Sequence, residues 1–354
     1  MIVYILAAIM IFGVLIAVHE FGHFAAAKLS GVKVNEFSIG MGPEIWSRKK
    51  GETQYSLRAF PIGGYCAMEG EDQDTGDKRC LVNQSFWKQF MILAAGSFMN
   101  FVTGVIILLV LYSGAVSFFT DQILYIAPEF TQTGENGLMP GDRVYKVNGY
   151  RTYLAGDTSL FLSYGKNGET EIEVIRDGRH IKVGGLERQV CTDKDGNPYT
   201  GFGITLGRHA EEATFGAKLR YTWHTALDFV QQIRFSLVQL VTGGASMKDL
   251  SGPVGIVSTI TEVGTQAESA QDAWFRIFYF AALIAVNLAV MNLLPIPALD
   301  GGRIFFLLID TVSLLLFKKK VPEKYQAAVN TVGFVVLMGF MLLVTFQDVF
   351  KLFQ

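Results

Sequence analysis

The stretch that decides the fold is IVYILAAIMIFGVLIAVHEFGH, residues 2–23. Residues 2–18 carry no charge, and His19, Glu20 and His23 follow them directly. An apolar run of this length predicts a membrane-spanning helix. Because positions i and i+4 of a helix share one face, the two imidazoles could bind one zinc ion. Glu20 lies between them and could take a proton from a water molecule on that ion.

Two other interpretations of this stretch remain open. The first is a secretory signal peptide, since the alanines at 25–27 resemble a cleavage site after an apolar core. Against it, no Lys or Arg precedes the run, and the run is longer than a usual signal core. The second is a helix whose histidines only mark the membrane surface. Ionisable groups at membrane depth are costly and usually functional, which favours metal binding.

The composition predicts a polytopic α-helical membrane protein. Half of the 354 residues are hydrophobic, 28 are Phe and 18% are charged, which fits several spans plus some soluble mass. The net charge of −2 gives no electrostatic case for a nucleic-acid partner. The three cysteines are widely spaced with no CxxC pair, so they form neither a disulfide framework nor a thiolate metal site.

The first region, residues 1–120, is predicted to be an N-terminal membrane domain. It holds the first span, a small β-hairpin region and a second span at about 90–112. Residues 37–43 and 55–60 are expected to be short strands, and 61–65 a turn. A strand edge near the zinc could hold a substrate in extended form, and an ordinary surface hairpin is the alternative.

Residues 121–207 alternate short β-like runs with Gly, Asn and Asp turns, which predicts a small α+β domain. Its central sequence, GLMPGDRV, resembles that of the PDZ domains of bacterial membrane and envelope proteases. The predicted loop holds Gly137, Leu138, Gly141 and Asp142. Such domains receive peptide ends by strand addition, and the alternative is a domain that blocks access by its bulk.

The rest of the chain divides into residues 208–260 and 261–354. The former is expected to be an interfacial amphipathic helix, at about 219–241, followed by a loop at 251–256. The latter is expected to be a C-terminal membrane domain. Its spans are predicted at about 277–294 and 329–346, which makes four in the chain, and 304–317 remains open as a further membrane segment.

The third zinc ligand is predicted where the third span breaks, in NLLPIPALDGG, residues 292–302. Two prolines interrupt the helix at membrane depth, where an aspartate is costly without a cation. A catalytic zinc takes three protein ligands and leaves the fourth position to water, so Asp300 is the best candidate. Weaker candidates are Glu69, Glu71 and Asp310. Alternatively, Asp300 caps the helix that follows.

Basic residues in the short loops predict the orientation of the chain. One cluster follows the first span and the other precedes the last, and both are expected to be cytoplasmic. Both termini and the 121–207 domain then face outward, and both metal-binding stretches lie near the cytoplasmic side. The residues of the two clusters are Lys28, Lys33, Arg48, Lys49, Lys50, Arg58, Lys318, Lys319, Lys320 and Lys324.

Taken together, the motifs resemble the site-2 proteases, in particular the bacterial branch with one PDZ domain, over nearly the whole chain. The motifs are HExxH in the first span, Gly-Met-Gly-Pro at 40–43, the PDZ-like insert and NxxPxPxLDGG near the end. The resemblance implies one Zn²⁺ ion per chain, held by His19, His23 and Asp300, with Glu20 as the general base.

The resemblance also implies residues that bind the substrate. Asn292, Pro295 and Pro297 would help to position an unwound substrate helix. The strand near 55–60 would present it, through the residues Ser56, Leu57 and Arg58.

The function implied is hydrolysis of peptide bonds within the transmembrane segments of single-pass membrane proteins, in the bilayer of a bacterial inner membrane. Family members cut an anti-sigma factor already trimmed by an upstream site-1 protease, or remnant signal peptides. The sequence departs from the family pattern at three positions, with Ser97 for Pro, Arg303 for His and Cys66 for Val. None of these removes a ligand or the base.

Two other functional classes are weighed against an enzyme. In a non-catalytic PDZ membrane adaptor the metal would be structural or absent. A structural zinc would be closed by four protein ligands, yet His180, His209 and His224 lie outside the metal-binding stretches. An ion or proton transporter using the buried His, Glu and Asp would show repeated membrane segments, and the sequence has none.

Overall fold

The computed structural model describes residues 2–71, 73–119, 121–163, 169–192, 196–207, 210–244, 250–319 and 321–351. The chain divides into two compact units. The first unit comprises Met1–Ile107 and Ile233–Gln354, and the second comprises Leu108–Gln232.

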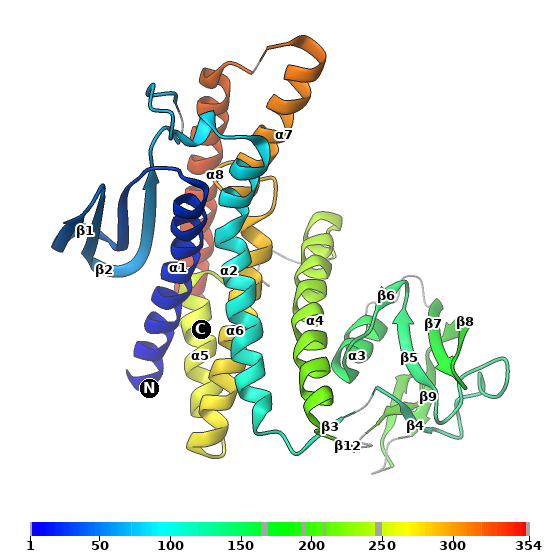
Figure 1. Cartoon of the computed structure of the whole chain (residues 1–354). Coiled ribbons are helices and arrows are strands. Elements are labelled where there is room, and N and C mark those ends of the chain that lie inside the picture. The colour runs from blue at the N-terminus through cyan, green and yellow to red at the C-terminus, as the bar shows by residue number, and fades with distance from the viewer. Residues whose placement is uncertain are drawn as a thin grey trace. The chain divides into compact units, whose positions relative to one another are not determined.

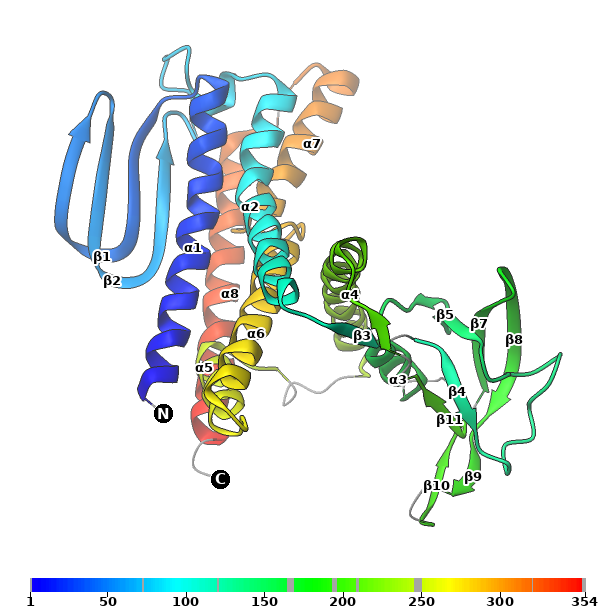
Figure 2. The same ribbon diagram turned by 60° about the horizontal axis from the view of Figure 1, so that its bottom comes forward.

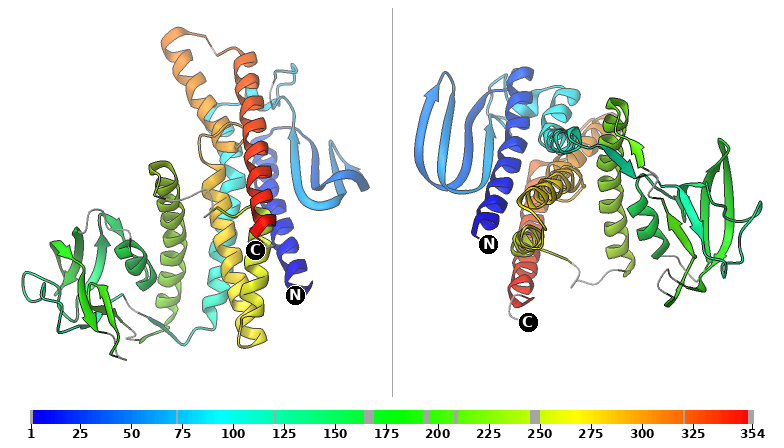
Figure 3. Two further views of the ribbon diagram at one scale, coloured as in Figure 1. Left: turned by 180° about the vertical axis from the view of Figure 1, so that it is seen from behind. Right: turned by 90° about the horizontal axis from the view of Figure 1, so that it is seen from below.

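The first unit is built from helices that run alongside one another, and the start of α1 and the end of α8 lie toward the same end (Figures 1 and 3). Among the described residues, four helices are long and apolar enough to cross a membrane, which confirms the four predicted spans. The 304–317 piece belongs to α7, which is not one of the four. The helices are α1 (Ile2–Ser30), α2 (Phe86–Ser113), α5 (Pro253–Thr265), α6 (Ala270–Asn292), α7 (Asp300–Phe317) and α8 (Glu323–Lys351).

A buried cluster joins α1, α5 and α6. Its alanines let the helix backbones approach one another, and the larger aliphatic side chains fill the space between them. The members of the cluster are Ala8, Leu15, Ile260, Ile277, Ile284 and Ala285. Helix α1, which carries the histidines, packs against α5, and α5 packs against α6, the helix that leads to Asp300.

The expected loop at 251–256 is wrong, because α5 begins inside it, at Pro253. Proline suits the first turn of a helix, where its missing N–H has no partner in any case. The carboxylate of Asp348 accepts hydrogen bonds from the N–H groups of Gly252 and Gly255, at 2.8 Å each. It thereby satisfies two N–H groups at the start of α5 that have no acceptor within the helix.

The hairpin region is larger than expected. Strand β1 (Val34–Lys50) pairs antiparallel with β2 (Thr53–Met68), beside α1 (Figure 2). Both strands bend and pair twice, which makes four rows in the order 64–68, 34–39, 53–58 and 44–50. The predicted turn at 61–65 is wrong, since these residues lie in β2, where the pairing is interrupted and Gly63 has a φ of 96°. A short 3-10 helix, Leu81–Asn83, precedes α2.

The second unit is of the α+β class. Its main sheet is antiparallel with strand order β6-β5-β7-β8, and the other described strands form two-stranded pairs. Helix α3 (Ala155–Ser163) lies in this unit, and α4 (Phe215–Thr242) begins in it. The strands are β3 (Ser117–Phe119), β4 (Ile123–Ile126), β5 (Arg143–Val147), β6 (Tyr150–Arg151), β7 (Glu169–Arg176), β8 (Arg179–Glu187), β9 (Gln189–Thr192), β10 (Pro198–Gly201), β11 (Ile204–Leu206) and β12 (Ala210–Glu212).

Candidate metal centre

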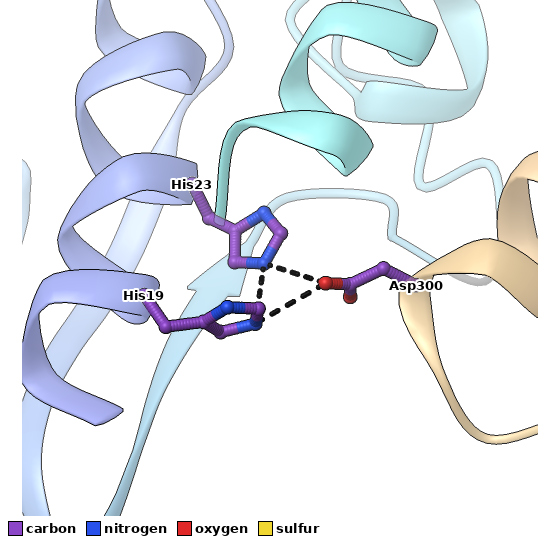
Figure 4. A group of neighbouring side chains, drawn as sticks. All are labelled: His19, His23 and Asp300. Carbon is purple, nitrogen blue, oxygen red and sulfur yellow. Dashed lines mark hydrogen bonds and ion pairs between the residues drawn. The ribbon is translucent and has the colours of Figure 1, made fainter. Parts of the chain in front are cut away.

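Two histidines of α1 and the first residue of α7 converge on one point (Figure 4). The Nε2 atoms of His19 and His23 each lie 3.2 Å from Oδ2 of Asp300, and 3.2 Å from each other. Both histidines are buried, with exposed fractions of 9% and 6%. Within the described part of the chain, this is the one group of three or more His, Cys, Asp or Glu side chains that could hold a metal ion.

Helix α2 holds both imidazole rings from the other side. Nδ1 of His23 lies 2.8 Å from the carbonyl oxygen of Ile92, and Nδ1 of His19 lies 3.3 Å from Nδ2 of Asn100. Partners of this kind orient the ring and leave the second nitrogen for a metal. Both Nε2 atoms therefore face the point where the three side chains meet.

The close contact between α1 and α2 requires glycine on both helices. A Cβ atom at Gly96 would lie 2.4 Å from Nε2 of His23 and 2.8 Å from Nε2 of His19. A Cβ atom at Gly22 would lie 2.4 Å from the carbonyl oxygen of Ala95. The small residues of the second span thus make room for the two imidazoles themselves.

We expect Gly96→Ala to weaken zinc binding roughly 10- to 100-fold, because the new methyl group must displace the rings, as loss of an outer-shell partner does. The measurement is zinc retained by the purified protein in competition with a chelator. Gly339→Ala is the control, since a Cβ atom at this α8 glycine meets no atom of the described residues within 4 Å. Equal zinc retention in the two variants would contradict the prediction.

Asp300 does not cap the helix that it begins. The capping position of α7 is Leu299, and no side-chain cap is present among the described residues. Oδ2 of Asp300 is buried, and the atoms that face it among the described residues are the Nε2 atoms of His19 and His23. A buried carboxylate oxygen that faces two imidazole nitrogens is a donor set that suits zinc and leaves a coordination position open.

The turn between α6 and α7 is tight enough to require the two glycines after Asp300. A Cβ atom at Gly301 would lie 2.2 Å from the carbonyl oxygen of Leu294, and one at Gly302 would lie 2.4 Å from that of Ile296. The Asp-Gly-Gly sequence therefore lets the first turn of α7 fold back on the end of α6, with the carboxylate directed at α1.

The weaker candidates for the third ligand are engaged elsewhere. The ammonium group of Lys33 donates to Glu69 at 2.8 Å, and with other donors it holds the pKa of this carboxyl at about 2. Glu71 forms an ion pair with Arg303, one of the three departures from the family pattern. Asp310 accepts hydrogen bonds from the chain at the start of α8.

The other two departures have a structural explanation only in part. Cys66 packs into a buried apolar cluster between α1, the hairpin and α2. Ser97 is fully buried, and its hydroxyl has no partner among the described residues. Nothing in the structure explains the serine.

The predicted substrate residues of the hairpin lie in an inner row. Ser56 and Leu57 pair with rows on both sides, so their main chain is not at a sheet edge. The guanidinium group of Arg58 donates to Glu36, to the hydroxyl of Tyr65 and to other groups within the hairpin. The three residues shape the hairpin in the structure, and their contact with substrate stays a prediction.

The outer row 64–68 is the part of the hairpin that meets the candidate base. Its residues pair with row 34–39 on one side only. A Cβ atom at Gly64 would lie 3.3 Å from Cγ of Glu20, so the side chain of Glu20 rests against this row. The signal for this row in the sequence is the pair of glycines at 63 and 64, which predicts a turn.

The remaining predicted substrate residues precede Asp300 in the chain. Asn292 is the last residue of α6, and Pro295 and Pro297 lie in the turn that leads to α7. Ala298 in this turn has a φ of 72°, a left-handed conformation that is strained for alanine.

The predicted PDZ loop is packed inside the second unit. Leu138 is fully buried, and Asp142 accepts two hydrogen bonds of 2.7 Å from the guanidinium group of Arg176. Gly137 and Gly141 belong to the same turn. A cavity of about 470 Å³ lies elsewhere in this unit, between α3 and β11, and is lined by Gly156, Ser159, Leu162, Ile204, Thr205 and Leu206.

Of the other three histidines, the two that the structure describes have partners away from the candidate metal group. His180 bonds to Glu173 at 2.8 Å, and the ring of His224 packs against that of Tyr153. His209 lies outside the described residues.

Comparison with known proteins agrees with this geometry. The model of peptidase family M50 matches residues 7–340. The chain is 36% identical, over 98% of each chain, to a Clostridium perfringens protein named "Putative zinc metalloprotease". It is 28% identical, over 99% of each chain, to "Regulator of sigma-W protease RasP" of Bacillus subtilis, and 29% identical, over 99% of each chain, to "Zinc metalloprotease RasP" of Shouchella clausii.

A family match over almost the whole chain, four apolar helices and a His-His-Asp group lead to one conclusion. The chain belongs to peptidase family M50, the site-2 proteases, and is a membrane zinc metalloprotease.

Proposed function

We propose that this protease hydrolyses peptide bonds inside the transmembrane segments of single-pass membrane proteins. The observation that carries the proposal is the position of the His-His-Asp group. Two of its members lie on α1, which is apolar enough to cross a membrane, and the third follows the break at the end of α6, another such helix. The adaptor and transporter alternatives lose their support with membership of a zinc metalloprotease family.

His19, His23 and Asp300 would hold the zinc ion. Zinc held in this way acts as a Lewis acid toward a peptide carbonyl and makes a water molecule more acidic. Glu20 is proposed to be the general base, because it follows His19 in the chain and contacts the outer row of the hairpin at Gly64. Its carboxylate would accept the proton of the attacking water and donate it to the leaving nitrogen.

A substrate helix hides its carbonyls in its own hydrogen bonds, so it must unwind before attack. An outer strand row can satisfy the freed N–H and C=O groups by main-chain pairing. Row 64–68 has one unpaired side among the described rows and contacts Glu20, which makes it the best place for the extended segment. Asn292, at the end of α6, and Pro295 and Pro297, in the turn before Asp300, would help to position the segment.

The test of this proposal is the position of the cut. The purified protein in liposomes is given a single-pass model substrate with a short outer segment, and the products are identified by mass spectrometry. Cleavage between residues of the apolar segment is expected. Cleavage confined to the soluble flanks of the substrate would show that the protein is a membrane-anchored protease that does not cut inside the membrane.

We further propose that the active site faces the cytoplasmic side, with both termini and the 121–207 domain extracytoplasmic, as the basic clusters indicate. In this arrangement the 121–207 domain excludes substrates with bulky outer segments. Substrates trimmed by an upstream protease would then be the natural class, such as an anti-sigma factor, consistent with the name of the sigma-W relative.

We expect the cleavage rate to fall steeply as the outer segment of the model substrate is lengthened to a folded domain. Leu162→Trp, which fills the cavity between α3 and β11, should leave this dependence unchanged if the domain acts by bulk. A series of substrates that differ only in the outer segment provides the measurement. Loss of cleavage of the short substrate in the Trp variant would show instead that peptide ends bind in the cavity.

A further inference from the structure

Arg58 lies in an inner row of the hairpin, and its guanidinium group reaches across the neighbouring row to the outer one. In the neighbouring row it donates hydrogen bonds to Oε1 of Glu36 at 2.9 Å and to Oγ of Ser38 at 3.1 Å. In the outer row it donates to the hydroxyl of Tyr65 at 2.6 Å. One side chain therefore joins three of the four rows, and this set of four residues is called the Arg58 clasp.

The Arg58 clasp is largely shielded from water. The side chains of Arg58 and Glu36 are 21% and 20% exposed, and Ser38 is buried. The guanidinium group also lies over the ring of Tyr65, 5.3 Å from its centre. Hydrogen bonds from a charged group are stronger than neutral ones, and the planar guanidinium holds its partners in a fixed geometry. The clasp is therefore a stiff link between the rows.

The clasp and Glu20 meet the outer row at adjacent residues. Successive side chains of a strand point to opposite faces. A Cβ atom at Gly64 would lie 3.3 Å from Cγ of Glu20, while the next residue, Tyr65, is held by Arg58. Cys66 then packs into the apolar cluster on the α1 side. The link to Arg58 is thus made one residue away from the point where the row meets the candidate base.

The outer row needs a link at this end. It pairs with other described rows on one side only, and it begins at Gly64 directly after an interruption in the pairing, where Gly63 has a φ of 96°. The register of a glycine-rich strand is weakly specified, and a slip by two residues would keep each side chain on the same face. Main-chain pairing alone therefore leaves the row free to slide, and the bond to the Tyr65 hydroxyl opposes this.

We propose that Arg58 is a positioning residue that acts through Tyr65. The clasp holds the outer row in one register beside Glu20, and an extended substrate segment that pairs with this row takes the same register. The clasp thereby decides which peptide bond of the segment reaches the base. This inference rests on the proposed pairing of the substrate with the outer row, and it gives Arg58 no direct contact with the substrate.

Two variants break the clasp in different ways. Tyr65→Phe removes the hydroxyl and keeps the ring, and Arg58→Lys keeps the charge but lacks the planar fork. We expect both variants to cut the model substrate at several neighbouring bonds, where the wild type cuts mainly at one, as read from the masses of the products. At that main bond kcat should fall roughly 10- to 100-fold, as small misplacements do. KM and zinc content should stay close to those of the wild type.

Thr53→Val is the matched control within the hairpin. The buried hydroxyl of Thr53 also bonds across rows, to the carbonyl oxygen of Val34 at 2.7 Å, but this bond does not involve the outer row. Wild-type cutting in Tyr65→Phe, or the same spread of cuts in Thr53→Val, would overturn the proposal. A raised KM with an unchanged cut in Arg58→Lys would overturn it too, because Arg58 would then contact the substrate itself.

Hydrogen exchange tests the clasp in the absence of substrate. The main-chain N–H groups of residues 64–68 should exchange faster in Tyr65→Phe than in the wild type or in Thr53→Val, because the row opens more often. Equal exchange in the three proteins would overturn the clasp. If the wild type made no cut inside the apolar segment, the proposed function would fail, and the role of the clasp in cleavage would fail with it.

Discussion

Glu20→Gln is expected to bind zinc as the wild type does and to lose peptide-bond hydrolysis by about 10²- to 10⁴-fold, the usual contribution of a general base. Glutamine has nearly the same shape as glutamate and can keep the contact with the outer hairpin row at Gly64. Its amide cannot accept a proton from water, so only the proton transfer is removed. The rate is measured on a model substrate in liposomes, and zinc by elemental analysis of the same samples.

Glu71→Gln is the matched control for this experiment. Glu71 lies within electrostatic reach of Glu20, but it forms an ion pair with Arg303. The same change of charge at this position should alter the rate only slightly, since a partly exposed ion pair contributes up to about 1 kcal/mol. Activity in Glu20→Gln, or an equal loss in both variants, would remove Glu20 from the role of base.

The three members of the candidate metal group can be predicted from the sequence, because each carries its own physical signal. His19 and His23 have the spacing of one helix face, inside a run that is too apolar to hold ionisable groups without a purpose. Asp300 stands where two prolines interrupt a membrane helix. The structure brings all three together to 3.2 Å between ligand atoms. Their roles as zinc ligands stay predictions.

The contacts around the group could not be read from the sequence, because they depend on long-range pairing. Asn100 is 81 residues from His19 in the chain, and only the register of α2 against α1 brings the amide to the ring. The hairpin shows the same limit, since alternation predicts strands but not which row is outermost. Two bends place row 53–58 inside the sheet and row 64–68 beside Glu20. The part of the hairpin close to the candidate base Glu20 is therefore row 64–68 and not the predicted strand 55–60.

Asp300→Ala is expected to abolish hydrolysis and to weaken zinc binding by more than about 100-fold. Removal of an outer-shell partner alone typically costs 10- to 100-fold in metal affinity, and a ligand should cost more. The imidazole rings should stay in place, because Ile92 and Asn100 hold them from α2. Zinc content after competition with a chelator, together with the cleavage rate, provides the measurement.

Asp310→Ala is the control for Asp300→Ala, because it removes a carboxylate from the same helix. Asp310 bonds to the chain at the start of α8, so its loss should lower the thermal stability somewhat and leave zinc binding intact.

If Asp300→Ala kept wild-type zinc, Asp300 would not be the third ligand. The two histidines would then need another partner, and Glu71 would be the first to test, since release from Arg303 would free a carboxylate within electrostatic reach of Glu20. Full activity of Asp300→Ala with a reduced zinc content would instead show that hydrolysis does not depend on the bound metal. Loss of both zinc and activity in Asp300→Ala alone is the result that ties the carboxylate to the metal and the metal to hydrolysis.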